Sequence, residues 1–425
     1  MHKHDYKAYD EVFYDFKVKD RLNVTVVPKP GFSKAFVSAS VPLGSVHEGF
    51  VNTQGEATHV PRGVAHFLEH KLFEFEGQDI SKAFSKHEAS VNAFTDHHQT
   101  TYLFSATGHV MDNAKRLLKM MYFPEITEEG VEKEKPIIQE ELNMHGDDPY
   151  YHAHRALLNN MYTHHPLRDE VLGSKESINA MSKDALMSMH EAYYTPENTQ
   201  VIIVGDVDPS EVEKTLNETI AMPKKAKTKA LPIKKELSPS VNTPYETQHY
   251  DMETPLLMMG FKLSPETFAG PHPIKEFLKY SIALETVFST SSQAYESLLE
   301  KGLVNDAFGV DVILEKSYAH GLLFAETKDV ETLRHALLEI LRSAKEAGVM
   351  EEDYRRVKRK MIGHHITAFD RLESLASEIN DYLQFDLYYH DLPSLLESVE
   401  LEDVNQALRS IKEDAVAFFG GLPKT

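Results

Sequence analysis

The sequence predicts an α+β protein of two tandem, structurally similar domains, each a mainly antiparallel sheet covered by helices. Three observations lead to this fold class. The chain has 425 residues, more than one hydrophobic core usually supports. A basic, proline-bracketed stretch interrupts it near the middle. Each half mixes short apolar runs typical of strands with longer segments of helical periodicity.

The domain boundary is predicted at the stretch from Pro223 to Pro232. This stretch is rich in lysine and has no apolar periodicity, as expected of a solvated linker. Prolines and serines continue to about Pro244. We therefore expect an N-terminal domain, a linker and a C-terminal domain at residues 1–225, 226–244 and 245–425.

In the first half, residues 22–27 and 34–39 predict two early strands, because apolar side chains alternate or cluster there. Residues 63–75 predict a helix. Its apolar stripe consists of Val64, Phe67, Leu68 and Leu72.

A hairpin is expected from residues 91–95 and 101–105, followed by a helix over residues 139–161 that is interrupted at 146–149. Both halves end with a helix, an apolar strand and a glycine turn, at residues 201–206 and 415–421. This weak internal repeat suggests duplicated domains.

Composition excludes several classes of protein. Apolar residues make up 41% and charged residues 26% of the chain, as in ordinary globular proteins. Cysteine is absent, so a transition-metal site must use histidine and carboxylate ligands. We find no signal-peptide pattern at the first residues and no apolar run of about 20 residues that could span a bilayer. A cytoplasmic enzyme is the simplest expectation.

The formal net charge of −21 gives little support to nucleic-acid or membrane binding, because such a surface repels phosphate and anionic lipid. It could favour cationic peptides, although a well-solvated acidic surface explains it as well.

His66, Glu69 and His70 form the pattern H-x-x-E-H within the predicted helix. Residues four apart lie one above the other on a helix, so both imidazoles can bind one ion. Glu69 shares this face and could accept a proton from a metal-bound water and return it to a leaving amine. The pattern alone does not exclude a surface helix with histidines or a metal-buffering face.

A catalytic zinc takes three protein ligands and keeps one open position. Glu134 and Glu141 are two helical turns apart and share a face, so Glu141 is a candidate third ligand and Glu134 a candidate partner that supports a ligand. Glu140 is the alternative ligand if the register is shifted by one residue. Without the histidine motif, these acids would indicate a solvated helix face.

Further segments follow the motif in a characteristic order. They are residues 63–73, residues 89–95, the Glu134/Glu141 pair, His165-Pro166, Val171-Leu172-Gly173, and residues 193–198 leading to Val204-Gly205-Asp206. Together they resemble the pitrilysin/insulinase family of inverted zincins, which includes mitochondrial processing peptidase and insulin-degrading enzyme. The match covers most of residues 20–210, and residues 71–74 resemble a bacterial branch of small, two-domain members.

The resemblance implies a processing-peptidase-like metallohydrolase fold with one Zn²⁺ per chain. It assigns His66, His70 and Glu141 as zinc ligands and Glu69 as the general base, with Glu134 supporting the site. Zinc rather than manganese or cobalt is an expectation from ligand type.

The resemblance also assigns the strand around Asn92, Ala93 and Phe94 to the substrate. An extended peptide would add to its edge by main-chain hydrogen bonds, a mode that depends little on sequence. From the residues alone, Phe94 and Tyr102 are expected more as core than as a specificity pocket.

The second half matches the family less well. Complete members carry an Arg and a Tyr, seven residues apart, that stabilise the substrate carbonyl electrostatically from the second domain. The expected strand is residues 320–327; the Arg position falls on Leu323 within it, and the Tyr position falls on Val330, just after its end. Either the alignment is wrong or another subunit supplies the pair. We favour a heterodimer with a related chain that carries the Arg/Tyr pair, and otherwise expect a homodimer.

The expected function is a zinc endopeptidase acting on short or unfolded peptides, with a partner completing the site. The alternative is a non-catalytic peptide-binding or assembly subunit on the same fold, which would have no need of Glu69 as a base. Metal storage is a third hypothesis and predicts several ions per chain. Neighbouring histidines do not share a helix face, so we do not expect ligands in the pairs His97-His98, His164-His165 and His364-His365.

Overall fold

The computed structural model describes residues 1–146, 148–233 and 238–424, with only the backbone of residue 266. It confirms the α+β class: two large sheets, each with mainly antiparallel pairs, are covered by helices. The chain forms two compact units, which are described in turn.

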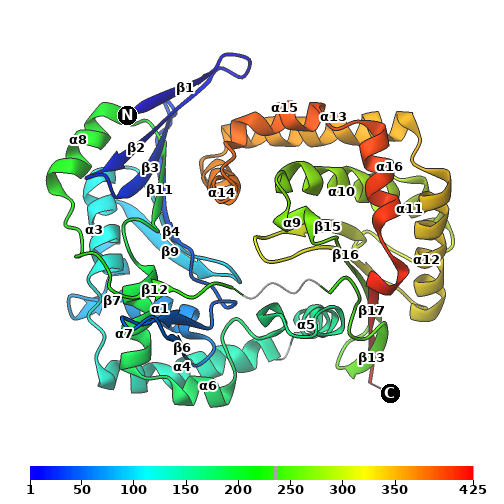
Figure 1. The fold of residues 1–425 in the computed structure, drawn as a ribbon, viewed down its shortest axis with the longest axis horizontal. Coiled ribbons are helices and arrows are strands. Elements are labelled where there is room, and N and C mark those ends of the chain that lie inside the picture. The colour runs from blue at the N-terminus through cyan, green and yellow to red at the C-terminus, as the bar shows by residue number, and fades with distance from the viewer. Residues whose placement is uncertain (147, 234–237, 425) are drawn as a thin grey trace. The chain divides into compact units, whose positions relative to one another are not determined.

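The first unit is built on a seven-stranded sheet in the order β1-β2-β3-β11-β4-β10-β9 (Figure 1). All neighbouring pairs are antiparallel except β3 and β11. The strands are β1 (His2–Tyr6), β2 (Glu11–Val18), β3 (Leu22–Pro28), β4 (Ala35–Val41), β9 (Ala89–Thr95), β10 (Thr100–Ala106) and β11 (Gln200–Gly205). Strand β9 ends the sheet, so no strand of the described chain pairs with its outer side.

Smaller elements complete this unit. Short strands pair as β12-β5-β6 and β7-β8; they are β5 (Gly49–Val51), β6 (Ala57–His59), β7 (Glu74–Phe75), β8 (Gln78–Asp79) and β12 (Lys229–Ala230). The helices are α1 (Val64–Phe73), α2 (Ser81–Ser85), α3 (Val110–Tyr122), α4 (Glu128–Gly146), α6 (Lys175–Ala180), α7 (Lys183–Tyr193), α8 (Pro209–Thr219) and α14 (Leu372–Leu383).

The second unit contains a five-stranded sheet in the order β13-β17-β14-β16-β15, in which only β13 and β17 are parallel. Its strands are β13 (Tyr245–Tyr250), β14 (Leu256–Lys262), β15 (Gly309–Leu314), β16 (Ala319–Glu326) and β17 (Val416–Pro423). Its helices are α5 (Pro149–Met161), α9 (Glu266–Ala269), α10 (Pro273–Phe288), α11 (Gln293–Glu300), α12 (Val330–Ala347), α13 (Glu351–Thr367), α15 (Leu392–Glu397) and α16 (Leu401–Ser410).

The two sheets share one topology. Taken in chain order, the five strands β3, β4, β9, β10 and β11 have the same neighbours and relative directions as β13 to β17. The repeat suggested by the two strand-and-glycine endings, now β11 and β17, is therefore a repeat of five strands, and β1 and β2 are additional to it in the first unit. The helix that corresponds to α1 is α10, which lacks the H-x-x-E-H motif.

The units are not contiguous halves of the chain. The first comprises Met1–Leu142, Asp169–Ile233 and Ile366–His390, and the second comprises Asn143–Arg168, Lys234–His365 and Asp391–Thr425. Helix α14 therefore packs on β4 and β11, and α5 packs on β14 and β17. The domains expected at residues 1–225 and 245–425 differ from these units in the two exchanged segments.

Most expected elements lie within a few residues of their predicted bounds, and one helix differs more. The helix expected over residues 139–161 is two helices, because α4 already begins at Glu128. The interruption occurs where it was expected: α4 ends at Gly146, and the side chain of Asp148 accepts hydrogen bonds from the first backbone amides of α5.

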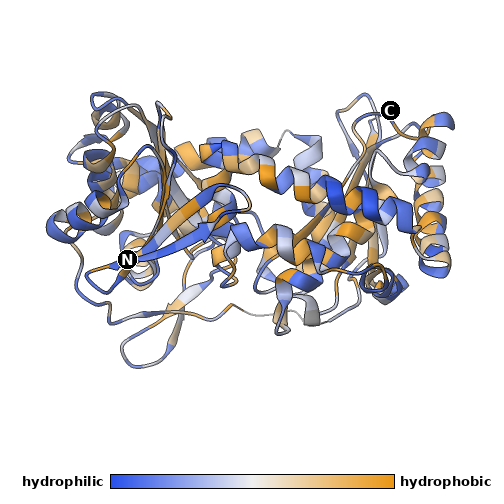
Figure 2. Ribbon diagram, turned by 90° about the horizontal axis from the view of Figure 1, so that it is seen from above, coloured by the Kyte–Doolittle hydropathy of each residue, from blue (hydrophilic) through white to orange (hydrophobic). Residues whose placement is uncertain are grey.

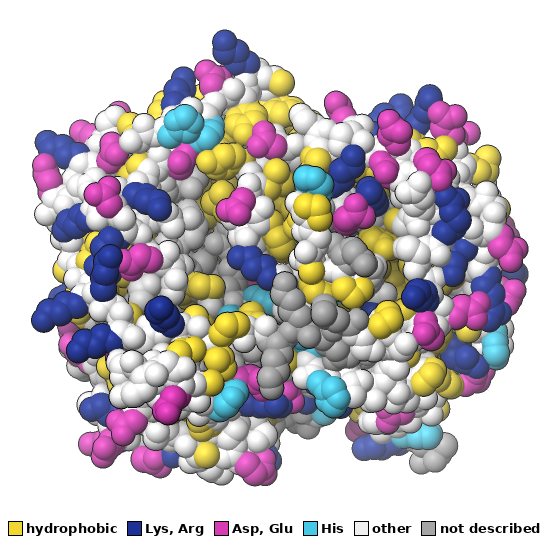
Figure 3. All heavy atoms as spheres, viewed as in Figure 1, with side chains coloured by type: hydrophobic (Ala, Val, Ile, Leu, Met, Phe, Trp, Pro, Cys, Tyr) yellow, Lys and Arg dark blue, Asp and Glu magenta, His cyan; other side chains and the backbone are white. Residues whose placement is uncertain are grey.

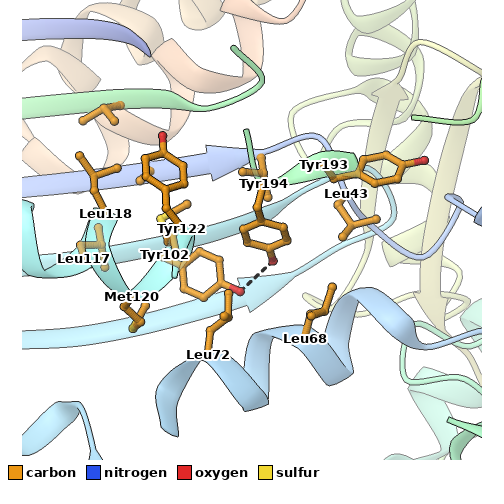
Figure 4. Packing of buried hydrophobic residues seen from close by; sticks show 14 of the residues in the cluster. Leu43, Leu68, Leu72, Tyr102, Leu117, Leu118, Met120, Tyr122, Tyr193 and Tyr194 are labelled. Atoms are coloured by element: carbon orange, nitrogen blue, oxygen red, sulfur yellow. Dashed lines mark hydrogen bonds between the residues drawn. The ribbon is translucent and has the colours of Figure 1, made fainter. Parts of the chain in front are cut away.

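The core of the first unit lies between one face of its sheet and helices α1, α3, α7 and α8. Figure 4 shows Leu68 and Leu72 of α1 beside Tyr102 and Tyr194, whose hydroxyls are 2.9 Å apart. Figure 2 shows that hydrophobic residues are concentrated in the strands of the sheets.

The surface is charged and mixed. On the face shown in Figure 3, acidic and basic side chains are interspersed. Among the described residues, no helix has both the length and the apolar character required to cross a bilayer.

Candidate metal and catalytic site

Helix α1 begins where two stretches of backbone touch. Gly63 has a φ of 85°, and a Cβ there would lie 2.2 Å from the carbonyl oxygen of Leu172. Gly173 has a φ of 84°, and its Cβ would lie 2.5 Å from the carbonyl oxygen of Arg62. Only glycine tolerates this combination of left-handed backbone and close approach. The start of α1 is thereby held against the loop at residues 171–173.

The side chains of His66, His70 and Glu141 converge from α1 and α4. Nε2 of His66 is 3.5 Å from Oε1 of Glu141, and Nε2 of His70 is 3.4 Å from Oε2 of the same carboxylate. One ligand atom from each side chain lies within 4.8 Å of the other two, and no other such group of three occurs in the described chain. The structure thus brings together the three predicted ligands, whereas Glu140 is exposed and outside the group.

The geometry of this group fits a zinc ion. Tetrahedral zinc with bonds of about 2.0–2.1 Å separates its ligand atoms by about 3.4 Å, and the two imidazole nitrogens lie at about this spacing from the two oxygens of Glu141, 3.5 and 3.4 Å respectively. Two imidazoles and one carboxylate also leave the fourth position that a catalytic zinc needs.

Charge at the site favours a cation. Burial lowers the pKa of His70, but hydrogen bonds to Glu134 and Glu141 outweigh it and raise the pKa to about 9. Hydrogen bonds from His66 and His70 hold the pKa of Glu141 far below its usual value. A divalent ion would replace the protons that otherwise hold these groups together.

Glu134 lies where a partner of a metal ligand is expected. Its Oε1 is 2.9 Å from Nδ1 of His70, and only 6% of the residue is exposed. Burial raises the pKa of Glu134, but His70 and Lys71 more than compensate and lower it. An ionised Glu134 accepts a hydrogen bond from the Nδ1–H of His70, which keeps the proton on Nδ1 and leaves Nε2 free to bind a metal.

Glu69 lies on α1 between the two histidines, at the spacing that places it on their side of the helix, and is held by a contact that sequence reasoning missed. The Thr95 hydroxyl donates a hydrogen bond of 2.5 Å to Oε2 of Glu69. Thr95 is the last residue of β9, so the candidate base is tied to the end of the candidate substrate strand. The signal in the sequence was a threonine within the quoted segment 89–95, to which no role was given.

The candidate substrate strand β9 presents alternating faces. Val91 and Ala93 pack against the core, whereas Asn92 is exposed. The side-chain oxygen of Asn92 accepts a 2.9 Å hydrogen bond from the N–H of Ala93. Phe94 is 43% exposed, so the expectation that it belongs to the core is wrong, while Tyr102 is fully buried as expected.

A lysine in α1 is the second missed feature. Lys71 follows His70 directly, is 1% exposed and contacts Glu134. Sequence reasoning used it only as part of a family segment. The signal that could have identified it is a charged residue three positions after Leu68 and four after Phe67, on the apolar stripe of the helix.

In the second unit, the positions that correspond to the Arg/Tyr pair carry no hydrogen-bond donor in their side chains. Leu323 is a buried residue of β16, and Val330 is the first residue of α12. Neither side chain can donate a hydrogen bond to a substrate carbonyl.

A helix with two histidines one turn apart, opposed by a carboxylate on a later helix, is the arrangement of a metallopeptidase. Family comparison gives the same class. Residues 37–175 match the model described as insulinase (peptidase family M16), and residues 180–361 match the model described as the peptidase M16 inactive domain. The chain belongs to the M16 peptidase family.

Relatives and solved structures match over nearly the whole chain. The uncharacterized zinc protease YmfH of Bacillus subtilis is 33% identical over 99% of both chains. The uncharacterized zinc protease YmxG of the same organism is 25% identical over 93% of this chain and 95% of its own. The crystal structure of an M16-like peptidase from Alicyclobacillus acidocaldarius has a TM-score of 0.92 and 28% identity, covering 97% and 99% of the two chains.

Proposed function

We propose that this protein is a zinc-dependent endopeptidase that hydrolyses short or unfolded peptides. The observation that carries the proposal is the convergence of His66, His70 and Glu141 within 4.8 Å, with Glu69 on the same helix. The zinc-protease names of relatives that match the whole chain support it.

His66, His70 and Glu141 would hold the ion, and Glu134 would orient His70. A bound zinc would lower the pKa of a water molecule and polarise the scissile carbonyl. Glu69 then takes the proton of the attacking water and returns it to the leaving amine. The Thr95 hydroxyl keeps the Glu69 carboxylate at the end of β9.

The substrate would bind as an extended strand along the outer side of β9. Its main chain would pair with the backbone around Ala93 once the side chain of Asn92 turns away from the N–H that it now covers. Phe94, exposed on the same strand, would contact substrate side chains. Such binding selects for extended, unfolded chains more than for particular sequences.

Glu69→Gln tests the mechanism. We expect the variant to bind zinc within twofold of the wild type and to hydrolyse an unfolded peptide about 10²- to 10⁴-fold more slowly, the range for loss of a general base. Glu140→Gln makes the same chemical change on an exposed neighbour of Glu141 and should keep both properties. Peptide cleavage by the Glu69 variant at the wild-type rate would refute the mechanism.

We further propose that the active form is a dimer in which a related chain supplies the Arg/Tyr pair. Leu323 and Val330 in place of these donors support this proposal. The purified chain should turn over unfolded peptides slowly and gain activity with a co-expressed chain of similar length that lacks H-x-x-E-H but has the pair. Robust turnover by a monomer or homodimer would contradict it.

A non-catalytic peptide-binding or assembly subunit is the second candidate function, because the model matched by residues 180–361 is described as an inactive domain. It predicts that zinc and peptide bind but that neither the chain alone nor any dimer cleaves peptide. Metal storage predicts several ions per chain, whereas the described residues offer one group of three suitable ligands.

A further inference from the structure

Lys71 is the most completely buried charged residue beside the candidate metal site. Its side chain is 1% exposed, in a position of α1 that packs among Phe67, Leu68 and Leu72. Burying an ammonium group is costly unless anions and hydrogen-bond acceptors surround it. An apolar residue at this position would not have the desolvation cost of a buried ammonium group. The lysine is therefore expected to have a specific role in its surroundings.

Lys71 contacts two residues of α4 and one residue that follows α1. Its Nζ donates to the carbonyl oxygen of Gly130 at 3.1 Å and lies 3.4 Å from Oε2 of Glu134 and 2.6 Å from Oε2 of Glu74. Gly130 and Glu134 belong to α4, and Glu134 holds Nδ1 of His70 with its other oxygen. The ammonium therefore joins α1 to the helix that supplies both Glu134 and Glu141.

The sequence of α4 makes room for this contact. A Cβ at position 130 would lie 3.2 Å from Nζ of Lys71 and 3.0 Å from the hydroxyl oxygen of Thr127. Glycine is unfavourable inside a helix by about 1 kcal/mol relative to alanine, yet it occupies the point where the ammonium meets α4.

We propose that Lys71 is a positioning residue for the metal site: it holds the Glu134 carboxylate against His70 and ties the first turns of α4 to α1, so that His70 and Glu141 meet at one ion. This inference rests on the zinc site of the proposed function. Lys71 acts through Glu134 and touches neither the ion nor the substrate.

Lys71→Met tests it, because methionine preserves length and packing but removes the charge and the hydrogen bonds. We expect zinc affinity, measured by competition with a chelator, to fall about 10- to 100-fold, as for other partners of metal ligands. Lys133→Met is the matched control. Lys133 is an exposed residue of α4 that forms an ion pair with Glu129, and its loss should leave affinity within twofold of the wild type.

A double-mutant cycle with Glu134→Gln tests whether Lys71 acts on the metal site through Glu134. Glu134→Gln alone should also weaken zinc binding, and adding Lys71→Met to it should cost less than threefold more. Wild-type affinity in Lys71→Met would overturn the proposal, as would the same loss in both backgrounds. Wild-type protein that binds no zinc would instead refute the proposed function.

Gly130→Ala keeps the proposal testable if Lys71→Met does not fold. Alanine should raise the intrinsic helix stability of α4, but its Cβ would press on Nζ of Lys71. We expect a higher melting temperature of the metal-free protein together with a several-fold lower zinc affinity. Unchanged affinity in a folded Gly130→Ala protein would contradict the proposed role of Lys71.

Discussion

At the scale of single residues, the hydroxyl of Thr95 is the clearest link between the proposed substrate strand β9 and the proposed base Glu69. It donates to Glu69 at 2.5 Å, and a hydrogen bond to a charged group contributes about 1.5–3 kcal/mol. Thr95→Val should therefore lower kcat on an unfolded peptide by about tenfold or more, with zinc content unchanged.

The matched control is Thr53→Val, at an exposed threonine whose hydroxyl donates to the side chain of the adjacent Gln54. It should have wild-type kinetics. If Thr95→Val keeps the wild-type kcat, the hydrogen bond does not position Glu69.

The adjacent acids of α4 provide a second prediction at this scale. Glu141→Gln removes a charged ligand oxygen, and we expect zinc affinity to fall by at least 100-fold. Glu140→Gln changes a neighbouring exposed acid and should not alter it. Equal effects of the two substitutions, measured by chelator competition, would refute Glu141 as the ligand.

Helical spacing placed Glu134 and Glu141 on one face, because they lie two turns apart, and the family resemblance assigned Glu141 as the ligand, with Glu140 as the alternative. The roles of Lys71 and Thr95 could not be predicted in this way. Each depends on a contact between residues far apart in the chain, Lys71 with residues 130 and 134 and Thr95 with residue 69. No local pattern marks such pairs.

At the scale of elements, helix α14 contains a partly buried carboxyl group, Glu378, whose ionisation destabilises the folded state. Glu378 has its pKa raised to about 7 by burial and then by the nearby charge of Asp381. A raised pKa in an acid means that the folded state binds protons more tightly than the unfolded state. Stability is therefore lost as pH rises from about 4.5 to about 7.

Glu378→Gln should remove this cost. We expect the free energy of unfolding, from denaturant titration, to rise on the order of 1 kcal/mol at pH 8 and to match the wild type near pH 4.5. Glu373→Gln, at an exposed position of the same helix, is the control and should show little effect at either pH. A gain independent of pH would disprove the electrostatic explanation.

The elements themselves were largely predictable. Alternating apolar residues located β3, β4 and the β9–β10 hairpin, and helical periodicity located α1. The start of α4 was missed because residues 128–135 are mostly charged and give no continuous apolar stripe. Here tertiary contacts through Val131, Glu134 and Ile138 stabilise the helix.

At the scale of the whole molecule, the exchange of segments makes each half of the chain depend on the other. Residues 1–233 lack α14, which packs on β4 and β11, and residues 234–425 lack α5, which packs on β14 and β17. We expect neither fragment alone to show a cooperative thermal transition by circular dichroism, because apolar faces of both sheets would be bare.

Co-expression of the two fragments should restore a soluble complex with a single transition. A fragment of residues 1–233 that melts as cooperatively as the full chain would contradict this dependence. The sequence could indicate two similar domains but not the exchange, since nothing in the composition of α5 or α14 indicates which sheet each helix covers.

The side-chain oxygen of Asn92 accepts a hydrogen bond from the backbone N–H of Ala93 and so satisfies one donor of the edge strand β9. Edge strands with unpaired backbone N–H and C=O groups can pair with other chains and cause aggregation. An incoming chain must displace this hydrogen bond before it pairs with the Ala93 amide, so an extended peptide that forms several main-chain hydrogen bonds is favoured over one that forms a single bond. For the proposed peptidase of unfolded chains, this contact would limit aggregation with its own substrates.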